Sequence, residues 1–266
     1  MNKPINIGVV GLGRLGRLYA RYFTNRLPGA RLYAVTDVAP EAVKATVAET
    51  GAKGFATTAE MLADPALDAV VVMTPTKMHG EVVIAAAAAK KAIFCEKPLS
   101  LEVSEGEAMK AAVAKHGVFF QLGFMRRFDK AYAAAKKRID AGEIGTPVIF
   151  KSSSKDALPP PVEYLRPASS GGLFIDMGIH DFDLARWYMG EVKQVYSVGN
   201  SIAFPEISGV GDVENGLSQM NFVNGGIGTI SLSRIGIYGY GIHTEIVGTG
   251  GTIQIRYDRQ TAILVM

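Results

Sequence analysis

A glycine-rich segment near the start of the chain constrains the fold more than any other feature of the sequence. The segment reads Gly11-Leu12-Gly13-Arg14-Leu15-Gly16; it follows an apolar run at residues 5–10 that is typical of a buried strand, and it opens a stretch with apolar residues at helical spacing. Glycines at these positions allow a tight turn and a close approach of the backbone to a pyrophosphate at the positive end of the helix. The motif predicts a dinucleotide-binding βαβ unit, and the alternative is an ordinary tight turn.

Asp37 strengthens this prediction and bears on the choice of dinucleotide. It stands 21 residues after Gly16, at the end of a second apolar strand, where a carboxylate can accept hydrogen bonds from the adenine ribose hydroxyls. The 2′-phosphate of NADP would meet a like charge there, and two unit charges about 4 Å apart repel by about 4 kcal/mol at an effective dielectric constant of about 20. We therefore expect NAD as the cofactor. The alternative is a surface aspartate.

The first 125 residues alternate short apolar runs with helical patterns, which is typical of a parallel sheet with crossover helices. The expected strands are residues 5–10, 32–36, 69–73, 92–95 and 118–122, and helices are expected at 81–90 and 102–116. This pattern predicts a doubly wound α/β unit over residues 1–125.

The pattern changes in residues 126–266. Helices are expected near 131–140 and from about 176, and strands at 148–153, 192–200, 213–223, 227–234, 243–248 and 252–256. Because Asn224-Gly225 and residues 248–251 are typical of turns, the late strands are interpreted as an antiparallel meander. The second half is therefore expected to be a separate α+β domain.

Composition excludes several classes of protein. The 28 Lys and Arg against 25 Asp and Glu leave a net charge of +3, which is too small for nucleic-acid binding, so a small-molecule partner is expected. The single cysteine, Cys95, cannot form an internal disulfide and suits the reducing cytoplasm. Apolar stretches are too short to span a bilayer, which needs about 20 residues, so no membrane partner is expected.

Two segments carry residues suited to acid–base chemistry. Lys97 follows the expected strand at 92–95, on the side of a parallel sheet where ligands bind, although a surface lysine is an equal alternative. Asp176, His180 and Asp183 are spaced to share one face of a helix. His180 could instead be a core histidine satisfied by Asp183. A zinc site is disfavoured, and no metal is expected, because one histidine and a few carboxylates are a poor ligand set.

These motifs together resemble the Gfo/Idh/MocA oxidoreductases over residues 1 to about 256, and among them the inositol 2-dehydrogenases. The resemblance rests on the glycine motif, Thr74-Pro75 followed by His79, Glu96-Lys97-Pro98, the segment GFMRRFD at 123–129, the spacing of Asp176 and His180, and Tyr238-Gly239-Tyr240. It implies a Rossmann NAD-binding domain at 1–125 and a substrate-binding and oligomerisation domain at 126–266. The second domain would have an open, mainly antiparallel sheet, often used for contacts in a homodimer or homotetramer.

The resemblance also implies roles for individual residues. The catalytic set would be Lys97, Asp176 and His180, with His180 as general base and Lys97 beside the developing oxyanion. The cofactor would be bound by Gly11, Leu12, Gly13, Arg14, Leu15, Gly16, Asp37, Thr74, Pro75, His79, Glu96, Lys97 and Arg126. The substrate, a cyclic polyol such as myo- or scyllo-inositol, would be bound by Lys97, Met125, Asp176, His180 and Tyr240.

Two departures from the family pattern leave alternatives open. Inositol enzymes commonly have Asp and then a basic residue after the second tyrosine of the Tyr-Gly-Tyr motif, whereas Gly241 and Ile242 follow Tyr240 here. Family members also continue for several tens of residues beyond the point where this sequence stops. Two interpretations follow: a C-terminally truncated chain, or a native end that leaves an open strand edge for a partner subunit to cover. The alternatives are a dehydrogenase acting on a pyranose sugar, an NAD-dependent glycosidase, and a non-catalytic regulator that senses NAD or a sugar.

Overall fold

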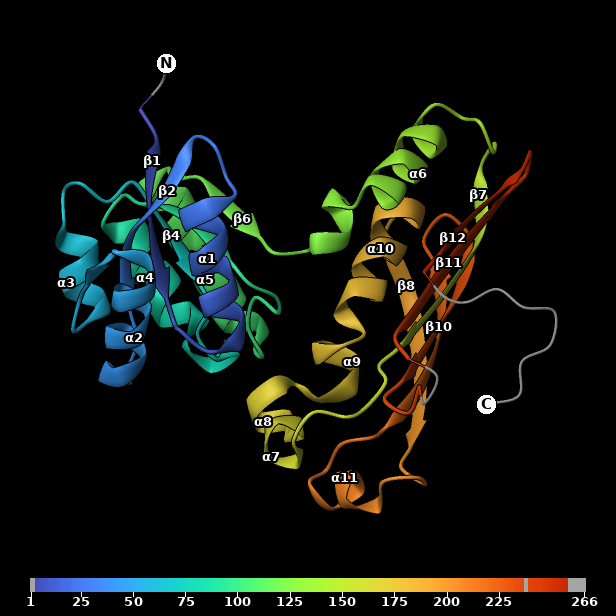
Figure 1. Cartoon of the computed structure of the whole chain (residues 1–266). Helices are drawn as coiled ribbons and strands as arrows, with labels where there is room; N and C mark the ends of the chain where they lie inside the picture. Colours follow the sequence, from blue (N-terminus) through green and yellow to red (C-terminus); the bar gives the residue numbers. More distant parts are fainter. Residues whose placement is uncertain (1–2, 237–238, 258–266) are drawn as a thin grey trace. The chain divides into compact units, whose positions relative to one another are not determined.

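The computed structural model describes residues 3–236 and 239–257 and divides the chain into two compact units (Figure 1). The first unit is Met1–Gly123 and the second is Phe124–Met266, so the division falls two residues before the expected boundary at 125. Each unit has hydrophobic clusters of its own. Tyr238, which is part of the expected Tyr-Gly-Tyr motif, lies outside the described residues.

The first unit is built around a parallel sheet with the strand order β3-β2-β1-β4-β5-β6. The strands are β1 Ile5–Val10, β2 Ala30–Thr36, β3 Lys53–Gly54, β4 Ala69–Val72, β5 Ala92–Cys95 and β6 Phe120–Leu122. The helices are α1 Arg14–Asn25, α2 Pro40–Thr50, α3 Thr58–Ala63, the short η1 Thr76–Met78, α4 His79–Ala88 and α5 Val103–His116. The order reverses direction between β1 and β4, where doubly wound sheets bind ligands. The predicted fold class is confirmed.

Burial explains why these segments form central strands. Val70, Val71 and Val72 of β4 are at most 3% exposed, as expected of a strand covered on both faces by crossover helices. Local chemistry sets the start of one of the covering helices: Thr57 caps α3 by accepting a hydrogen bond from Glu60 N at 3.1 Å. The sheet and its helices therefore form where the sequence patterns place them.

The second unit is a mixed sheet with the order β12-β11-β7-β10-β9-β8. Its strands are β7 Pro147–Lys155, β8 Val192–Asn200, β9 Asn215–Phe222, β10 Ile227–Ser233, β11 Gly241–Gly248 and β12 Thr252–Arg256. Its helices are the short η2 Met125–Phe128, α6 Lys130–Asp140, α7 Val162–Leu165, α8 Pro167–Ser170, α9 Gly172–Asp176, α10 Ile179–Met189 and α11 Pro205–Gly209.

The simple meander expected for the late strands is wrong at one point. β7 lies between β10 and β11, parallel to β10 and antiparallel to β11, so β10 and β11 are not neighbours. The two turn signals at residues 223–226 and 249–251 do join antiparallel pairs, β9 with β10 and β11 with β12. The connection from β10 to β11 therefore joins two strands that lie on opposite sides of β7.

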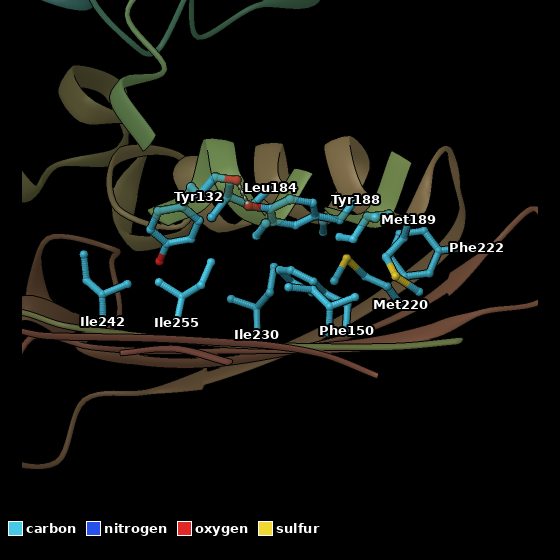
Figure 2. Packing of buried hydrophobic residues seen from close by; sticks show 14 of the residues in the cluster. Tyr132, Phe150, Leu184, Tyr188, Met189, Met220, Phe222, Ile230, Ile242 and Ile255 are labelled. Carbon is cyan, nitrogen blue, oxygen red and sulfur yellow. Dashed lines mark hydrogen bonds between the residues drawn. The ribbon is translucent and has the colours of Figure 1, made fainter. Parts of the chain in front are cut away.

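One face of this sheet packs against helices α6 and α10 (Figure 2). Buried side chains from both layers interlock between them, among them Tyr132, Phe150, Leu184, Tyr188, Met220, Phe222 and Ile230. Along β9 the residues alternate, with Ser218, Met220 and Phe222 buried and Leu217 and Gln219 exposed. The sheet therefore has one covered and one open face in the single chain, as its period-two pattern requires.

The helix expected from Asp176 is interrupted, which corrects the single helical face assumed for Asp176 and His180. Helix α9 ends at Asp176 and α10 begins at Ile179, with Gly178 between them. A Cβ on Gly178 would lie 2.6 Å from Leu232 Cδ1 of the sheet and 2.7 Å from the Phe174 carbonyl oxygen. The close approach of the joint to β10 thus requires glycine and separates the two helices.

Candidate active site

The glycine motif forms a turn at the carboxyl end of β1 that touches the end of β4. Gly11 has φ +93°, and a Cβ there would lie 2.7 Å from the Met73 carbonyl carbon and oxygen. A Cβ on Gly16 would lie 1.9 Å from the Gly11 carbonyl oxygen, because helix α1 packs directly on the turn. Both glycines are therefore required by neighbouring backbone.

Gly13 differs from these two glycines in its surroundings. It is the N-cap of α1, and a Cβ placed on it would meet nothing within 4 Å. The first turn of α1 has no acidic residue and no side-chain cap, and Arg14 and Leu15 in that turn are exposed. A helix N-terminus with open space in front of its N–H groups is suited to bind an anion such as a pyrophosphate.

Asp37 lies against this turn. Its Oδ2 accepts a hydrogen bond from Leu12 N at 2.5 Å, and its Oδ1 accepts one from Ala39 N at 2.8 Å. The basic residue nearest in sequence before it, Arg31, donates to Asn6 Oδ1 at 2.7 Å instead. The carboxylate is thus held beside the glycine turn, where the ribose of a bound dinucleotide is expected.

The ends of β4 and β5 are tied together by a buried histidine. His79 is 1% exposed, and its Nδ1 and Nε2 lie 2.9 Å from Pro98 O and 3.0 Å from Thr74 O. Both ring nitrogens contact backbone carbonyls, so His79 is placed to orient the loops at Thr74-Pro75 and Lys97-Pro98. Thr74 Oγ1 is buried and has no hydrogen-bond partner among residues 3–236 and 239–257. A bound polar ligand would satisfy it.

Glu96 holds the backbone of the Glu96-Lys97-Pro98 turn. Its Oε1 accepts from Tyr19 OH at 2.9 Å, and its Oε2 accepts from Lys97 N at 3.0 Å. Burial, together with the charge of Glu96, raises the pKa of Tyr19 well above its usual value, so the tyrosine stays a donor. Lys97 is therefore presented at the carboxyl end of β5, on the same edge of the sheet as the glycine turn and Asp37.

In the second unit, Asp176 stands at the end of α9. Its Oδ1 accepts from Tyr164 OH at 3.1 Å, and its Oδ2 lies 3.5 Å from Arg234 Nη2. His180 is half-buried in the first turn of α10. Asp183, one turn further along α10, accepts hydrogen bonds from Arg127 at both of its oxygens, at 2.7 and 2.8 Å.

Arg126 is buried in the second unit. Its Nη1 donates to Asp181 Oδ1 at 2.7 Å and its Nη2 to Ser154 Oγ at 2.9 Å, while its Nε has no partner within the described ranges. Burial lowers the pKa of Arg126, but the charge and hydrogen bond of Asp181, together with Tyr132 and Tyr240, raise this pKa by more, so it lies above its usual value and the guanidinium stays charged. Met125 and Tyr240 are more than half exposed.

Sequence reasoning missed three polar residues around Asp176 and Tyr240. Tyr164 and Arg234 contact Asp176, and the charge of Asp156 at the end of β7 contributes to raising the pKa of Tyr240, after burial as the main cause. No local pattern could have found Arg234, which is 58 residues from Asp176 in sequence. No group of three or more His, Cys, Asp or Glu within residues 3–236 and 239–257 is arranged to hold a metal ion.

Comparisons with known families agree with this geometry. Residues 5–124 match the profile of the GFO_IDH_MocA family, described as an oxidoreductase family with an NAD-binding Rossmann fold, and residues 132–254 match the GFO/IDH/MocA C-terminal domain. The chain belongs to the Gfo/Idh/MocA oxidoreductase family. The first unit is accordingly its NAD-binding Rossmann domain, and the expected cofactor is confirmed. The open space at Gly13, the uncapped α1 N-terminus and the buried Thr74 hydroxyl all fit NAD.

Similar proteins cover nearly the whole chain. The scyllo-inositol 2-dehydrogenase (NAD(+)) of Bacillus subtilis strain 168 is 40% identical over 268 residues, which cover 100% of this chain and 78% of that protein. The myo-inositol 2-dehydrogenase of Thermotoga maritima is 39% identical over 263 residues, covering 98% and 78%. The crystal structure of scyllo-inositol dehydrogenase from Lactobacillus casei, with bound NAD(H) and scyllo-inositol, matches with a TM-score of 0.88 and 36% identity over 95% of this chain and 76% of that one.

None of the helices in the described part of the chain has the length and apolar character that crossing a bilayer requires. The cytoplasmic location inferred from the single cysteine stays a prediction. Cys95 is buried, and burial raises the pKa of its thiol to about 12, so the group is a packing residue at neutral pH.

Proposed function

We propose that this member of the family oxidises one ring hydroxyl of myo- or scyllo-inositol to a ketone, with NAD as the hydride acceptor. The observation that carries the proposal is similarity over nearly the full chain to inositol dehydrogenases, one of which holds both NAD(H) and scyllo-inositol. Lys97, Asp176 and His180 support it further, because a protein that only sensed NAD or a sugar would not need an acid–base set.

The energetics of the reaction assign a role to each group. An alcohol with a pKa near 16 would cost roughly 12 kcal/mol to ionise fully at pH 7, because it lies about 9 pH units above that pH. A positioned general base accelerates a reaction by about 10²–10⁴-fold, which is too little to offset full ionisation of the alcohol. Removal of the proton must therefore overlap with removal of the hydride. Bound NAD supplies the hydride acceptor, which no side chain can be. His180 takes the hydroxyl proton, and Lys97 donates a hydrogen bond to the same oxygen as its charge develops.

The remaining proposed residues bind and orient. Asp176 orients the substrate or His180, and the exposed side chains of Met125 and Tyr240 contact the polyol. In the first unit, the turn from Gly11 to Gly16 binds the pyrophosphate, Asp37 binds the ribose, and Thr74 and Pro75 line the cofactor. We propose that His79, Glu96 and Arg126 position other groups. His79 and Glu96 hold the loops at the ends of β4 and β5 that contact the cofactor. Arg126 holds Asp181 and Ser154 in the second unit.

We also propose that the open face of the second unit's sheet joins copies of the chain into a homodimer or homotetramer. Val198 and Leu217 are paired across β8 and β9 on this face, and both are exposed in the single chain. An exposed apolar sheet face is costly unless it is covered. Sedimentation should show a dimer or tetramer that Leu217→Lys dissociates, and a monomeric wild type would overturn this assembly.

Transfer of a deuterium label tests the function directly. Myo-inositol deuterated at carbon 2 should deliver its label to NAD, and the scyllo isomer, aldoses and aryl glycosides run beside it separate the alternatives. Release of an aglycone without net NADH would identify a glycosidase, and faster turnover of an aldose would identify a sugar dehydrogenase. No label transfer from any cyclic polyol or aldose would remove the dehydrogenase proposal.

The pH dependence tests the general base. His180 must be neutral to take a proton, so the rate of oxidation should rise with pH between about pH 6 and pH 8, the range in which histidine side chains change charge. His180→Ala should flatten this rise and keep NAD binding. A rise that survived in His180→Ala would place the base elsewhere.

A further inference from the structure

A buried arginine lies between two carboxylates in the second unit, and one of them is Asp176. Arg234 follows β10 and is 1% exposed. Its Nη1 donates to Asp212 Oδ2 at 2.7 Å, and its Nη2 lies 3.5 Å from Asp176 Oδ2. A guanidinium removed from water loses its hydration, so its position is dictated by the carboxylates that compensate for that loss.

Asp212 anchors this arginine and also the start of the helix that carries Asp176. Its Oδ1 accepts a hydrogen bond from Leu173 N at 2.9 Å, at the beginning of α9. Gly172 has φ +71°, and a Cβ on it would lie 2.6 Å from Asp212 Oδ1, so only glycine permits this approach. Asp212 is therefore packed directly against the first residues of α9.

The two ends of α9 are thus linked through one pair of charged side chains. Asp212 holds the first turn at Leu173, and Arg234, held by Asp212, faces the carboxylate at the last residue, Asp176. The planar guanidinium directs two different nitrogens at the two carboxylates, which the single ammonium of a lysine cannot reproduce. We name this pair, Asp212 and Arg234, the α9 brace.

The two oxygens of Asp176 face different surroundings. Oδ2 faces the buried Arg234, whereas Oδ1 accepts from Tyr164 OH, and the Tyr164 side chain is 50% exposed. A hydroxyl arriving from solvent can take the place of an exposed tyrosine hydroxyl much more easily than it can displace a buried guanidinium. The Oδ1 side is therefore the side open to a substrate hydroxyl.

We propose that Arg234 is a positioning residue for the reaction: through the α9 brace it sets the orientation of Asp176, so that Oδ1 is presented to the substrate. This inference rests on the proposed function, because it gives Asp176 a part in polyol oxidation. Arg234 itself acts through Asp176 and does not touch the substrate. The contact of 3.5 Å is long in the free protein and is expected to shorten when substrate binds, as catalytic hydrogen bonds commonly do.

Arg234→Lys in the full-length chain tests the proposal, because it keeps the charge and removes the planar fork. Displacement of an orienting group by about 1 Å can cost about 10²-fold, so kcat on the active inositol should fall by about that factor. The kinetic isotope effect with deuterated substrate should rise, because hydride transfer becomes slower relative to product release. The dissociation constant for NAD, measured by fluorescence titration, should stay unchanged.

A double-mutant cycle separates positioning from a purely structural role. In an Asp176→Asn background, Arg234→Lys should lower the single-turnover rate by less than about threefold, because the group through which it acts is already altered. Asp212→Asn is the second variant, to be used if Arg234→Lys does not fold. It keeps the shape of the anchoring side chain and removes its charge, and we expect kcat to fall by about tenfold.

Two variants serve as controls, one for a general loss of stability and one for the replacement of an arginine by lysine. Tyr188→Phe removes a buried hydrogen bond to Tyr132 O in the same unit, and it should destabilise the chain while leaving kcat and the isotope effect unchanged. Arg186→Lys alters an arginine whose side chain is 59% exposed, and it should behave as the wild type.

The outcomes distinguish this inference from the proposed function. A wild type that oxidises inositol, together with an Arg234→Lys variant of unchanged kcat and isotope effect, would overturn the positioning role alone. The positioning role would also be overturned if Arg234→Lys lowered the single-turnover rate by the same factor in the wild-type and Asp176→Asn backgrounds, because two independent substitutions have multiplicative effects on the rate. A wild type inactive on every cyclic polyol would overturn both.

Discussion

Replacement by alanine at two glycines of the cofactor turn should change two different properties, NAD affinity at Gly13 and stability of the fold at Gly16. Gly13→Ala places a methyl group where nothing lies within 4 Å, on a backbone at φ −63° that alanine readily adopts. Gly16→Ala places a methyl group 1.9 Å from the Gly11 carbonyl oxygen. We expect the first change to reduce NAD binding in a folded protein, and the second to destabilise the fold.

The structure sets the size of both effects. For Gly13→Ala, the methyl group holds the pyrophosphate away from the helix N–H groups, and one lost charge-assisted hydrogen bond costs about 1.5–3 kcal/mol, roughly 10- to 100-fold in Kd. For Gly16→Ala, an ordinary contact near 3.5 Å requires helix α1 to move by about 1.5 Å. Overpacking of this kind costs about 1–3 kcal/mol and should lower Tm by roughly 3–10 °C.

Two measurements on each variant check the reasoning. Isothermal titration with NAD gives Kd, and thermal unfolding without NAD gives the stability of the free protein. Gly13→Ala should lower the free energy of unfolding by only about 1 kcal/mol, the difference expected between glycine and alanine at an N-cap position. Wild-type NAD affinity in Gly13→Ala would refute the placement of the pyrophosphate, and a wild-type Tm in Gly16→Ala would refute the contact with Gly11.

Three further predictions concern single charged residues. Because Asp37 would repel a 2′-phosphate, the wild type should prefer NAD over NADP by at least about tenfold in kcat/KM, and Asp37→Ser should erode this preference; equal use of both cofactors by the wild type would contradict the assignment. Lys97→Met should lower kcat by about 10²–10³-fold with little change in NAD affinity, and normal turnover with lost NAD affinity would make Lys97 a cofactor ligand instead. Burial raises the pKa of Glu214, but three backbone N–H donors together outweigh burial and leave this pKa below its usual value of 4.5. The ionised Glu214 therefore stabilises the folded chain above pH 4.5, and this contribution is lost as the pH falls through the pKa that Glu214 has in the folded chain. Urea unfolding between about pH 5 and pH 3 should therefore show a smaller loss of stability in Glu214→Gln than in the wild type, and equal losses would show that another group titrates.

The sequence by itself determined the local elements and the cofactor half of the site. The expected strands at 5–10, 92–95, 192–200 and 252–256 coincide with β1, β5, β8 and β12, because burial imposes a short apolar or alternating pattern that is visible in the residues themselves. The glycine turn and Asp37 were likewise predictable, since the turn, the helix N-terminus and the acid belong to one βαβ unit and lie close together along the chain.

Only the tertiary structure decided which distant residues meet. The insertion of β7 between β10 and β11, the pairing of Arg126 with Asp181 and the contacts of Arg234 with Asp212 and Asp176 join positions 22 to 101 residues apart. A residue pattern states that a strand has a buried face or that a charge lies near an apolar segment, but it does not state which strand lies beside it. Strand order and register select the partner of a buried charge, and for this reason the residues that hold Asp176 became visible only in the folded chain.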